Sequence, residues 1–166
     1  MEQSMLEKLI IYFIRKTKGY ITKTQLVKFV YLADLYSVKW TEQQLTEIDW
    51  RYYHYGPWSK DIDQAISELS NQHILQVAEN GEAQLIQPLE GCPEIEKLQL
   101  SKGLELMLRN IQKEWAGIQT EKREALLDFV YKTAPMLEVK GKHQPDEKFP
   151  LDLSLEHEKL VAELGV

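Results

Sequence analysis

The amino-acid sequence predicts a single α+β domain that is mostly helical, carries a small antiparallel sheet and in part resembles a winged helix. Three observations predict this fold. Apolar residues recur at helical spacing in several segments, and an aromatic-rich segment at residues 50–55 has the composition of a strand. Two short apolar runs also flank Asn80-Gly81, a favoured hairpin turn. At 166 residues the chain is long enough to bury a core.

Two helices are expected near the start of the chain. Apolar residues at helical spacing predict the first helix over residues 2–17, and Gly19 ends it. Thr22 and Gln25 have the spacing of a capping box, which marks the start of the second helix. Because that second helix is apolar on more than one face, we expect it at the centre of the domain.

The remaining elements follow from caps and turns. The segment at 50–55 is expected to be a strand that ends at Gly56-Pro57, and Ser59 caps the next helix. One antiparallel sheet is expected from strands at residues 50–55, 74–79 and 83–88. Three later helices are expected at residues 101–115, 120–133 and 154–164.

These elements predict the domain organisation and the core. Residues 1–140 are expected to form the domain, followed by a polar linker and a short C-terminal helix over residues 141–166. The expected core residues are Leu9, Phe13, Leu26, Phe29, Val30, Ala33, Ile62, Ile66, Leu69, Leu108 and Ile111.

Charge is unevenly distributed along the chain, whose formal net charge is −6. Residues 1–39 carry seven basic against three acidic side chains, whereas residues 61–166 carry eleven against twenty. An acidic body argues against nucleic acid as the main partner.

The cysteine content and the apolar runs indicate the compartment. The single cysteine, Cys92, excludes an internal disulfide and fits a reducing environment. The longest apolar run, at residues 9–14, is too short to span a bilayer. A cytoplasmic protein without a membrane partner is therefore expected.

No pattern of catalytic residues is present. The four histidines are scattered, Cys92 lies between acidic residues, and there is no Gly-rich phosphate loop. We therefore expect no catalytic residue, no metal site and no cofactor. A hydrolytic enzyme with His54 and His73 as metal ligands is the third functional hypothesis.

A DNA-binding regulator is the alternative to a protein-binding function. In the winged-helix analogy, residues 59–71 form the recognition helix and residues 79–82 the wing tip. The outward positions of that helix hold one basic and three acidic residues, and the tip holds two acids without a base. Phosphate contacts supply most of the affinity for DNA, so these surfaces disfavour it.

The segment DWRYYHYGPWSKDI, at residues 49–62, holds two of the four tryptophans. Aromatic side chains beside an arginine are typical of binding hot spots and also of ordinary cores. Successive strand residues face opposite sides, so we expect Trp50 and Tyr52 to pack inward. We expect Arg51, Tyr53 and Trp58 to contact a partner.

Two motifs together resemble a known family. KFVYLAD, at residues 28–34, precedes YYHYGPWSKDI by about twenty residues, and this pairing is similar to the SocA-like antitoxin family, the Panacea domain, also called phage-associated GepA-like. The likeness covers residues 5–140. The matching positions are Tyr31, Ala33, Asp34, Tyr55, Gly56 and Pro57.

Two positions depart from the family pattern. Members commonly have a Thr-His pair near the end of the penultimate helix, where this chain has YKTAP, and Trp58 replaces a small or branched residue. The resemblance implies the antitoxin of a toxin–antitoxin system, which neutralises a toxin encoded beside it by direct protein–protein interaction. Toxin type varies widely among members.

Overall fold

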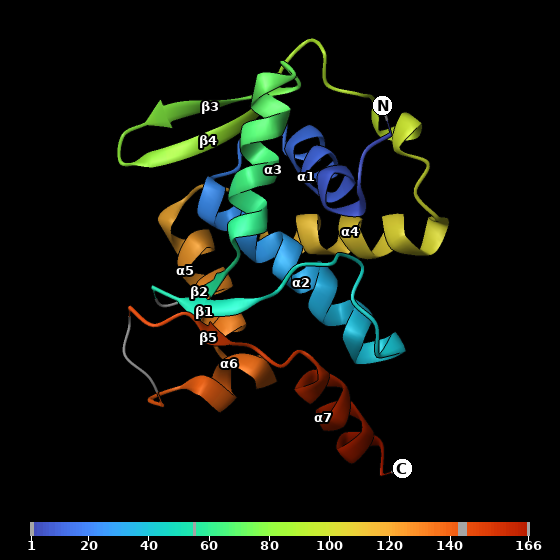
Figure 1. The fold of residues 1–166 in the computed structure, drawn as a ribbon, viewed down its shortest axis with the longest axis vertical. Coiled ribbons are helices and arrows are strands. Elements are labelled where there is room, and N and C mark those ends of the chain that lie inside the picture. Colours follow the sequence, from blue (N-terminus) through green and yellow to red (C-terminus); the bar gives the residue numbers. More distant parts are fainter. Residues whose placement is uncertain (1, 55, 143–145, 166) are drawn as a thin grey trace.

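The computed structural model describes residues 2–54, 56–142 and 146–165. Figure 1 shows α2 crossing the middle of the molecule, with α1 and α3 on one side and α5, α6 and α7 on the other. The helices are α1 (Met5–Lys16), α2 (Lys23–Thr41), α3 (Lys60–Asn71), the 3₁₀ helix η1 (Ile95–Leu98), α4 (Lys102–Trp115), α5 (Thr120–Tyr131), α6 (Ala134–Val139) and α7 (Ser154–Leu164). Within these described residues, no helix is both long and apolar enough to cross a membrane.

Helix α2 is the centre of the domain, as its apolar faces predict. It contacts α1, α4, α5 and α7, and also strands β2 and β4. Its first turn is closed by the predicted capping box: the Gln25 amide donates to Thr22 Oγ1 at 3.1 Å, and the Thr22 amide donates to Gln25 Oε1 at 2.9 Å. All eleven expected core residues are buried, so the predicted core is confirmed.

The strands form two sheets, so the prediction of one sheet was wrong. Strands β1 (Arg51–Tyr53), β2 (Gly56–Trp58) and β5 (Phe149–Pro150) form one sheet in the order β2-β1-β5, and β3 (Leu75–Asn80) pairs with β4 (Ala83–Pro88) in the other. The expected strand at 50–55 is cut short because the chain reverses after Tyr53, which pairs with Gly56. Pro57 lacks an N–H donor and is accommodated because β2 is an edge strand.

The second hairpin differs from its predicted turn by one residue. Asn80 pairs with Ala83, so the two turn residues are Gly81 and Glu82. Gly81 adopts φ +65° at the first turn position, where a hairpin turn of this length favours glycine.

The chain between α1 and α2 pairs with this hairpin. Thr22 forms an isolated bridge with Leu85, and the Ile86 amide donates to the Ile21 carbonyl at 3.0 Å. Helix, bridged segment, helix, helix and hairpin follow one another as in a winged helix, although the β1–β2 hairpin is inserted between α2 and α3. The partial likeness to that fold stays a prediction.

The C-terminal segment packs on the rest of the chain. The helix expected at 154–164 is present and contacts α2 and α6, while β5 pairs with β1. Leu151, Leu153 and Leu160 are buried. Helix α6 was not expected: α5 ends at Tyr131, and α6 has a proline in its first turn, where no N–H is needed. The boundary at residue 140 stays a prediction.

Asp34 is a fully buried carboxylate that accepts hydrogen bonds from five neutral donors. Its Oδ1 accepts from the main-chain amides of Leu45 and Thr46, at 2.9 and 3.0 Å. Its Oδ2 accepts from Gln44 Nε2 at 3.3 Å, from Thr46 Oγ1, and from Trp50 Nε1 at 2.9 Å. Burial raises the pKa of the Asp34 carboxyl above its ordinary value, and these hydrogen bonds counter the rise.

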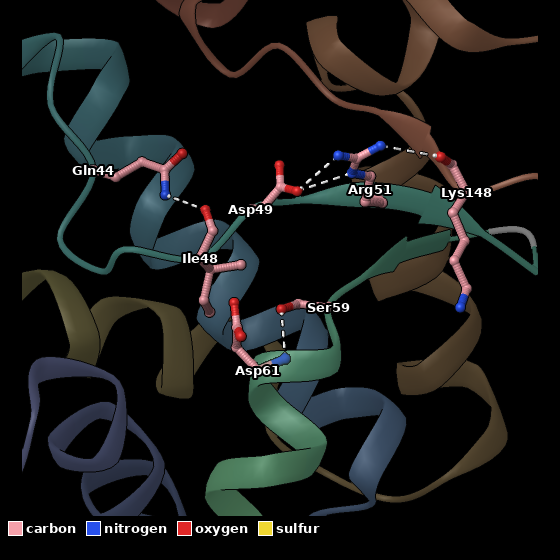
Figure 2. A network of polar contacts seen from close by, with 7 residues as sticks. All are labelled: Gln44, Ile48, Asp49, Arg51, Ser59, Asp61 and Lys148. Atoms are coloured by element: carbon pink, nitrogen blue, oxygen red, sulfur yellow. Dashed lines mark hydrogen bonds and ion pairs between the residues drawn. The ribbon is translucent and has the colours of Figure 1, made fainter.

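These contacts fix the chain between α2 and β1. Gln44 also donates to the Ile48 carbonyl at 3.0 Å, as Figure 2 shows, so the segment folds back on itself. The Trp50 ring packs edge-on against Tyr31, with centroids 5.4 Å apart. Strand β1 begins at the next residue, and Asp34 therefore sets where the three-stranded sheet starts.

Changing Asp34 to asparagine tests this arrangement. Asp34→Asn replaces one acceptor oxygen by an NH₂ group, so either the two main-chain amides or the side-chain donors lose their acceptor. We expect the free energy of unfolding to fall by about 2 kcal/mol or more, measured by urea denaturation. Asp128→Asn, at an exposed position on α5, is the matched control. Equal midpoints for both variants would contradict this role.

Removing the buried indole is a second test of the same region. Trp50 is 2% exposed, so Trp50→Ala leaves a cavity and removes one of the three hydrogen bonds that Asp34 Oδ2 accepts. We expect a loss of about 3 kcal/mol or more in circular-dichroism melts. Trp40→Ala removes an indole that is 65% exposed and is expected to leave the melt nearly unchanged. Comparable losses in the two variants would contradict the inward packing of Trp50.

Candidate functional site

The sheet β2-β1-β5 gathers aromatic side chains on one face. Trp58 is paired with Arg51, which lies two residues before Tyr53 and therefore on the same face as Tyr53. The Tyr53 and Trp58 rings meet edge-on with centroids 5.4 Å apart. Lys148 places its Nζ 5.1 Å from the Tyr53 centroid and 4.4 Å from that of Trp58. We call Tyr53, Trp58 and Lys148 the aromatic face.

Arg51 contacts the segment just before β5, which carries Lys148. Its Nε and Nη2 donate to Asp49 Oδ2 at 3.0 and 2.8 Å, and its Nη1 donates to the Lys148 carbonyl at 3.4 Å. Figure 2 shows the guanidinium between these two groups, with the Lys148 side chain directed away from it. Arg51 thus lies beside the other two predicted residues, and three of its donors are engaged within the chain.

The opposite side of the hairpin packs inward, as predicted. Trp50 is fully buried, and Tyr52 is half-buried against the hydrophobic core. The predicted inward packing of Trp50 and Tyr52 is therefore confirmed. Tyr53 and Trp58 remain half-buried and line a cleft.

This cleft, of about 660 Å³, lies between the N-terminal half of α2, the β1–β2 hairpin and α5. Its volume is within the range of ligand-binding pockets, roughly 300–1,000 Å³. We call it the hairpin cleft. Lys23, Lys28 and Arg123 contribute its basic groups, and Asp63 and Glu124 its acidic ones.

Lys28 is a half-buried cation of the hairpin cleft that has no partner among the described residues. Lys23 Nζ is 2.7 Å from Asp63 Oδ1. Lys28 is half-buried, and its ammonium makes no hydrogen bond or ion pair with any residue that the structure describes. Burial alone lowers the pKa of Lys28.

The described residues of the two family motifs are buried. Tyr31, Ala33 and Asp34 are completely buried in α2, and Gly56 and Pro57 are buried in β2. Tyr55 lies outside the described residues. The motif residues therefore belong to the buried structure that supports the aromatic face and the hairpin cleft.

Tyr31 also connects the first motif to the YKTAP segment. The Thr133 hydroxyl donates to the Val130 carbonyl at 2.7 Å, so the Tyr31 hydroxyl donates to Thr133 Oγ1 at 2.8 Å. Burial raises the pKa of Tyr31, which keeps this hydroxyl protonated. This contact fixes the end of α5, one wall of the cleft, against α2.

The histidines that the structure describes are not arranged to bind a metal together. His54 precedes α3 and His73 follows it, and a 12-residue helix is about 18 Å long, so the proposed ligand pair is separated. His143 lies outside the described residues. Among the described residues, no group of three His, Cys, Asp or Glu side chains is placed to hold a metal ion.

Cys92 is not set up as a nucleophile. Its side chain is buried, and burial raises the pKa of the Cys92 thiol, although Arg15 opposes that effect. Arg15 uses its donors on the carbonyls of Cys92 and Pro93. This group therefore joins α1 to the segment before η1.

Sequence reasoning missed two residues of the site. Lys28 places a charge on an otherwise apolar surface of α2. That charge was the sequence signal that could have identified Lys28 as a site residue. Lys148 lies in the segment predicted to be a polar linker, where no local pattern indicates a contact. Its position follows from the pairing of β5 with β1.

Comparison with known proteins gives one match. Residues 26–139, well over half of the chain, match the family described as antitoxin SocA-like, Panacea domain. No curated protein and no solved structure matches the chain. The matched range runs from α2 to α6 and includes both sequence motifs, whereas Lys148 lies beyond it. The chain belongs to the SocA-like antitoxin family and contains its Panacea domain.

Proposed function

We propose that this chain is a non-catalytic antitoxin that acts in the cytoplasm and neutralises a toxin encoded beside it by direct binding. Family membership is the observation that carries the proposal, because an antitoxin implies a toxin partner. Co-expression with the product of the neighbouring reading frame tests it. Rescue of growth from a toxic product supports the proposal, and no rescue contradicts it.

The aromatic face and the hairpin cleft are the binding surface that we propose. Tyr53 and Trp58 are large aromatic side chains that line a concave site, and aromatic side chains at pockets are typical binding hot spots. They are held by cross-strand pairing and by mutual ring contact. Since these rings are already ordered in the free chain, less conformational entropy is lost when a partner binds.

Arg51 has a different part in this proposal. Its guanidinium is engaged by Asp49 and by the Lys148 carbonyl. Replacing Arg51 would therefore alter the placement of Lys148 as well as any direct contact with the toxin. Tyr53 and Trp58 are the sharper positions for testing the surface.

Truncation of the two rings tests the binding surface. We expect Tyr53→Ala and Trp58→Ala each to weaken toxin binding by more than about 1 kcal/mol, because hot-spot side chains lose their buried contact area. Affinity is measured by isothermal titration calorimetry and stability by circular-dichroism melts. The melts are expected to change little, since both side chains are only half-buried.

Trp40→Ala is the matched control, because Trp40 is an exposed indole near the other end of α2. We expect it to bind the toxin like the wild type. If Trp58→Ala unfolds the chain without a separate binding defect, Trp58 belongs to the core and the toxin binds elsewhere. If Trp40→Ala alone weakens binding, the surface lies at the C-terminal end of α2.

A DNA-binding regulator is the alternative, favoured by the winged-helix order of elements. The charges oppose it: the exposed side chains of α3 include Asp63 and Glu68 against Lys60, and the hairpin tip carries Glu79 and Glu82. Such surfaces repel phosphate.

A gel shift with the promoter upstream of the gene separates the two functions. We expect no sequence-specific complex at physiological salt, because few cations are available to replace the counterions of DNA. A shift that is specific and falls steeply with salt concentration would favour the regulator instead. An unrelated DNA fragment of equal length is the control.

A further inference from the structure

The hairpin cleft has an excess of positive charge in an acidic chain. Lys23 and Asp63 form an ion pair, which leaves Lys28 and Arg123 against Glu124. The chain as a whole has a formal net charge of −6. The cleft therefore attracts a single negative group more than the surrounding surface does.

Lys28 is the group on which this attraction centres. An exposed lysine keeps its ammonium hydrated, whereas Lys28 is half-buried beside apolar residues of α2 and has no counter-ion among the described residues. Burying an unpaired charge costs free energy. A carboxylate brought into the cleft would offset that cost and would gain from the low polarity of its walls.

We infer that the hairpin cleft binds an acidic side chain of the toxin, with Lys28 as the counter-ion and with Tyr53 and Trp58 against the neighbouring toxin residues. This inference rests on the proposed function and specifies the chemistry of the partner at the same site. A polyanion fits less well than one carboxylate, since Asp63 and Glu124 also line the cleft.

The shape of the surface suits a peptide segment. A second cleft, of about 720 Å³, shares Lys23, Thr24 and Arg123 with the hairpin cleft and extends to the tip of the β3–β4 hairpin. An extended segment of the toxin can place its acidic side chain beside Lys28 and continue along this second cleft.

Lys28→Met tests the inference, because methionine keeps an unbranched apolar stem and removes the charge. We expect the free variant to melt at the same temperature as the wild type or higher, since an unpaired buried charge is removed. Toxin affinity is expected to fall by about tenfold or more, as when one partner of a buried ion pair is lost. Lys97→Met, at an exposed position on η1, is the matched control and should change neither quantity.

The outcomes distinguish the inference from the proposed function. If Lys28→Met binds like the wild type while Tyr53→Ala binds weakly, the toxin uses the aromatic face and the inference about Lys28 is overturned. If Lys28→Met lowers the melting temperature substantially, Lys28 has a structural role and the inference is likewise overturned. If the wild-type chain does not bind the toxin, the proposed function fails.

A measurement on the free chain tests the cleft without the toxin. Sodium acetate, as a carboxylate probe, is titrated into the chain labelled with ¹³C-lysine, and the Cε resonance of Lys28 is followed by NMR. We expect a saturable shift that sodium chloride at equal ionic strength does not produce. A shift that does not saturate, or one that chloride reproduces, would overturn the carboxylate site.

Discussion

The rest of the structure depends on the buried carboxylate of Asp34. A carboxylate removed from water requires new hydrogen bonds, and here five neutral donors supply them in place of a cation. Four of the five come from one short segment, residues 44–46, and the fifth is the Trp50 indole. Satisfying one charge therefore fixes the path of the chain from the end of α2 to the start of β1.

That path determines where the aromatic face lies. Once Trp50 is placed against Tyr31, the strand that follows alternates between core and surface, with Tyr52 inward and Tyr53 outward. The edge strand β2 then returns Trp58 to the same face as Tyr53. The α2 helix that buries Asp34 also carries Lys28, so the support of the site and its half-buried cation belong to one element.

The site combines a stable scaffold with a group that is unfavourable in the free chain. Ring contacts and strand pairing hold the aromatic residues, whereas Lys28 lies half-buried without a counter-ion among the described residues. Binding sites often retain such groups because their interactions are completed only in the complex. Lys148 adds a cation from a segment outside the matched family range, which places a feature of this particular chain on a surface built by the shared motifs.

The sequence by itself determined the elements whose signals are local. The capping box at Thr22 and the cap at Ser59 were predictable because each involves neighbours within three residues. The core was predictable because helical periodicity separates buried from exposed positions before any tertiary contact is known. The family motifs were recognisable for the same reason: each is a short run of consecutive residues.

Only the tertiary structure decided the pairings between distant segments. The division into two sheets follows from which strands meet in space. The position of Lys148 depends on β5, which is about 97 residues from β1 and pairs with it through main-chain groups that carry no sequence signal. The tertiary structure also decides which charged side chains line the hairpin cleft. Lys28 has no counter-ion among the described residues, although Asp63 and Glu124 line the same cleft, and spacing along the chain contains no information about that arrangement.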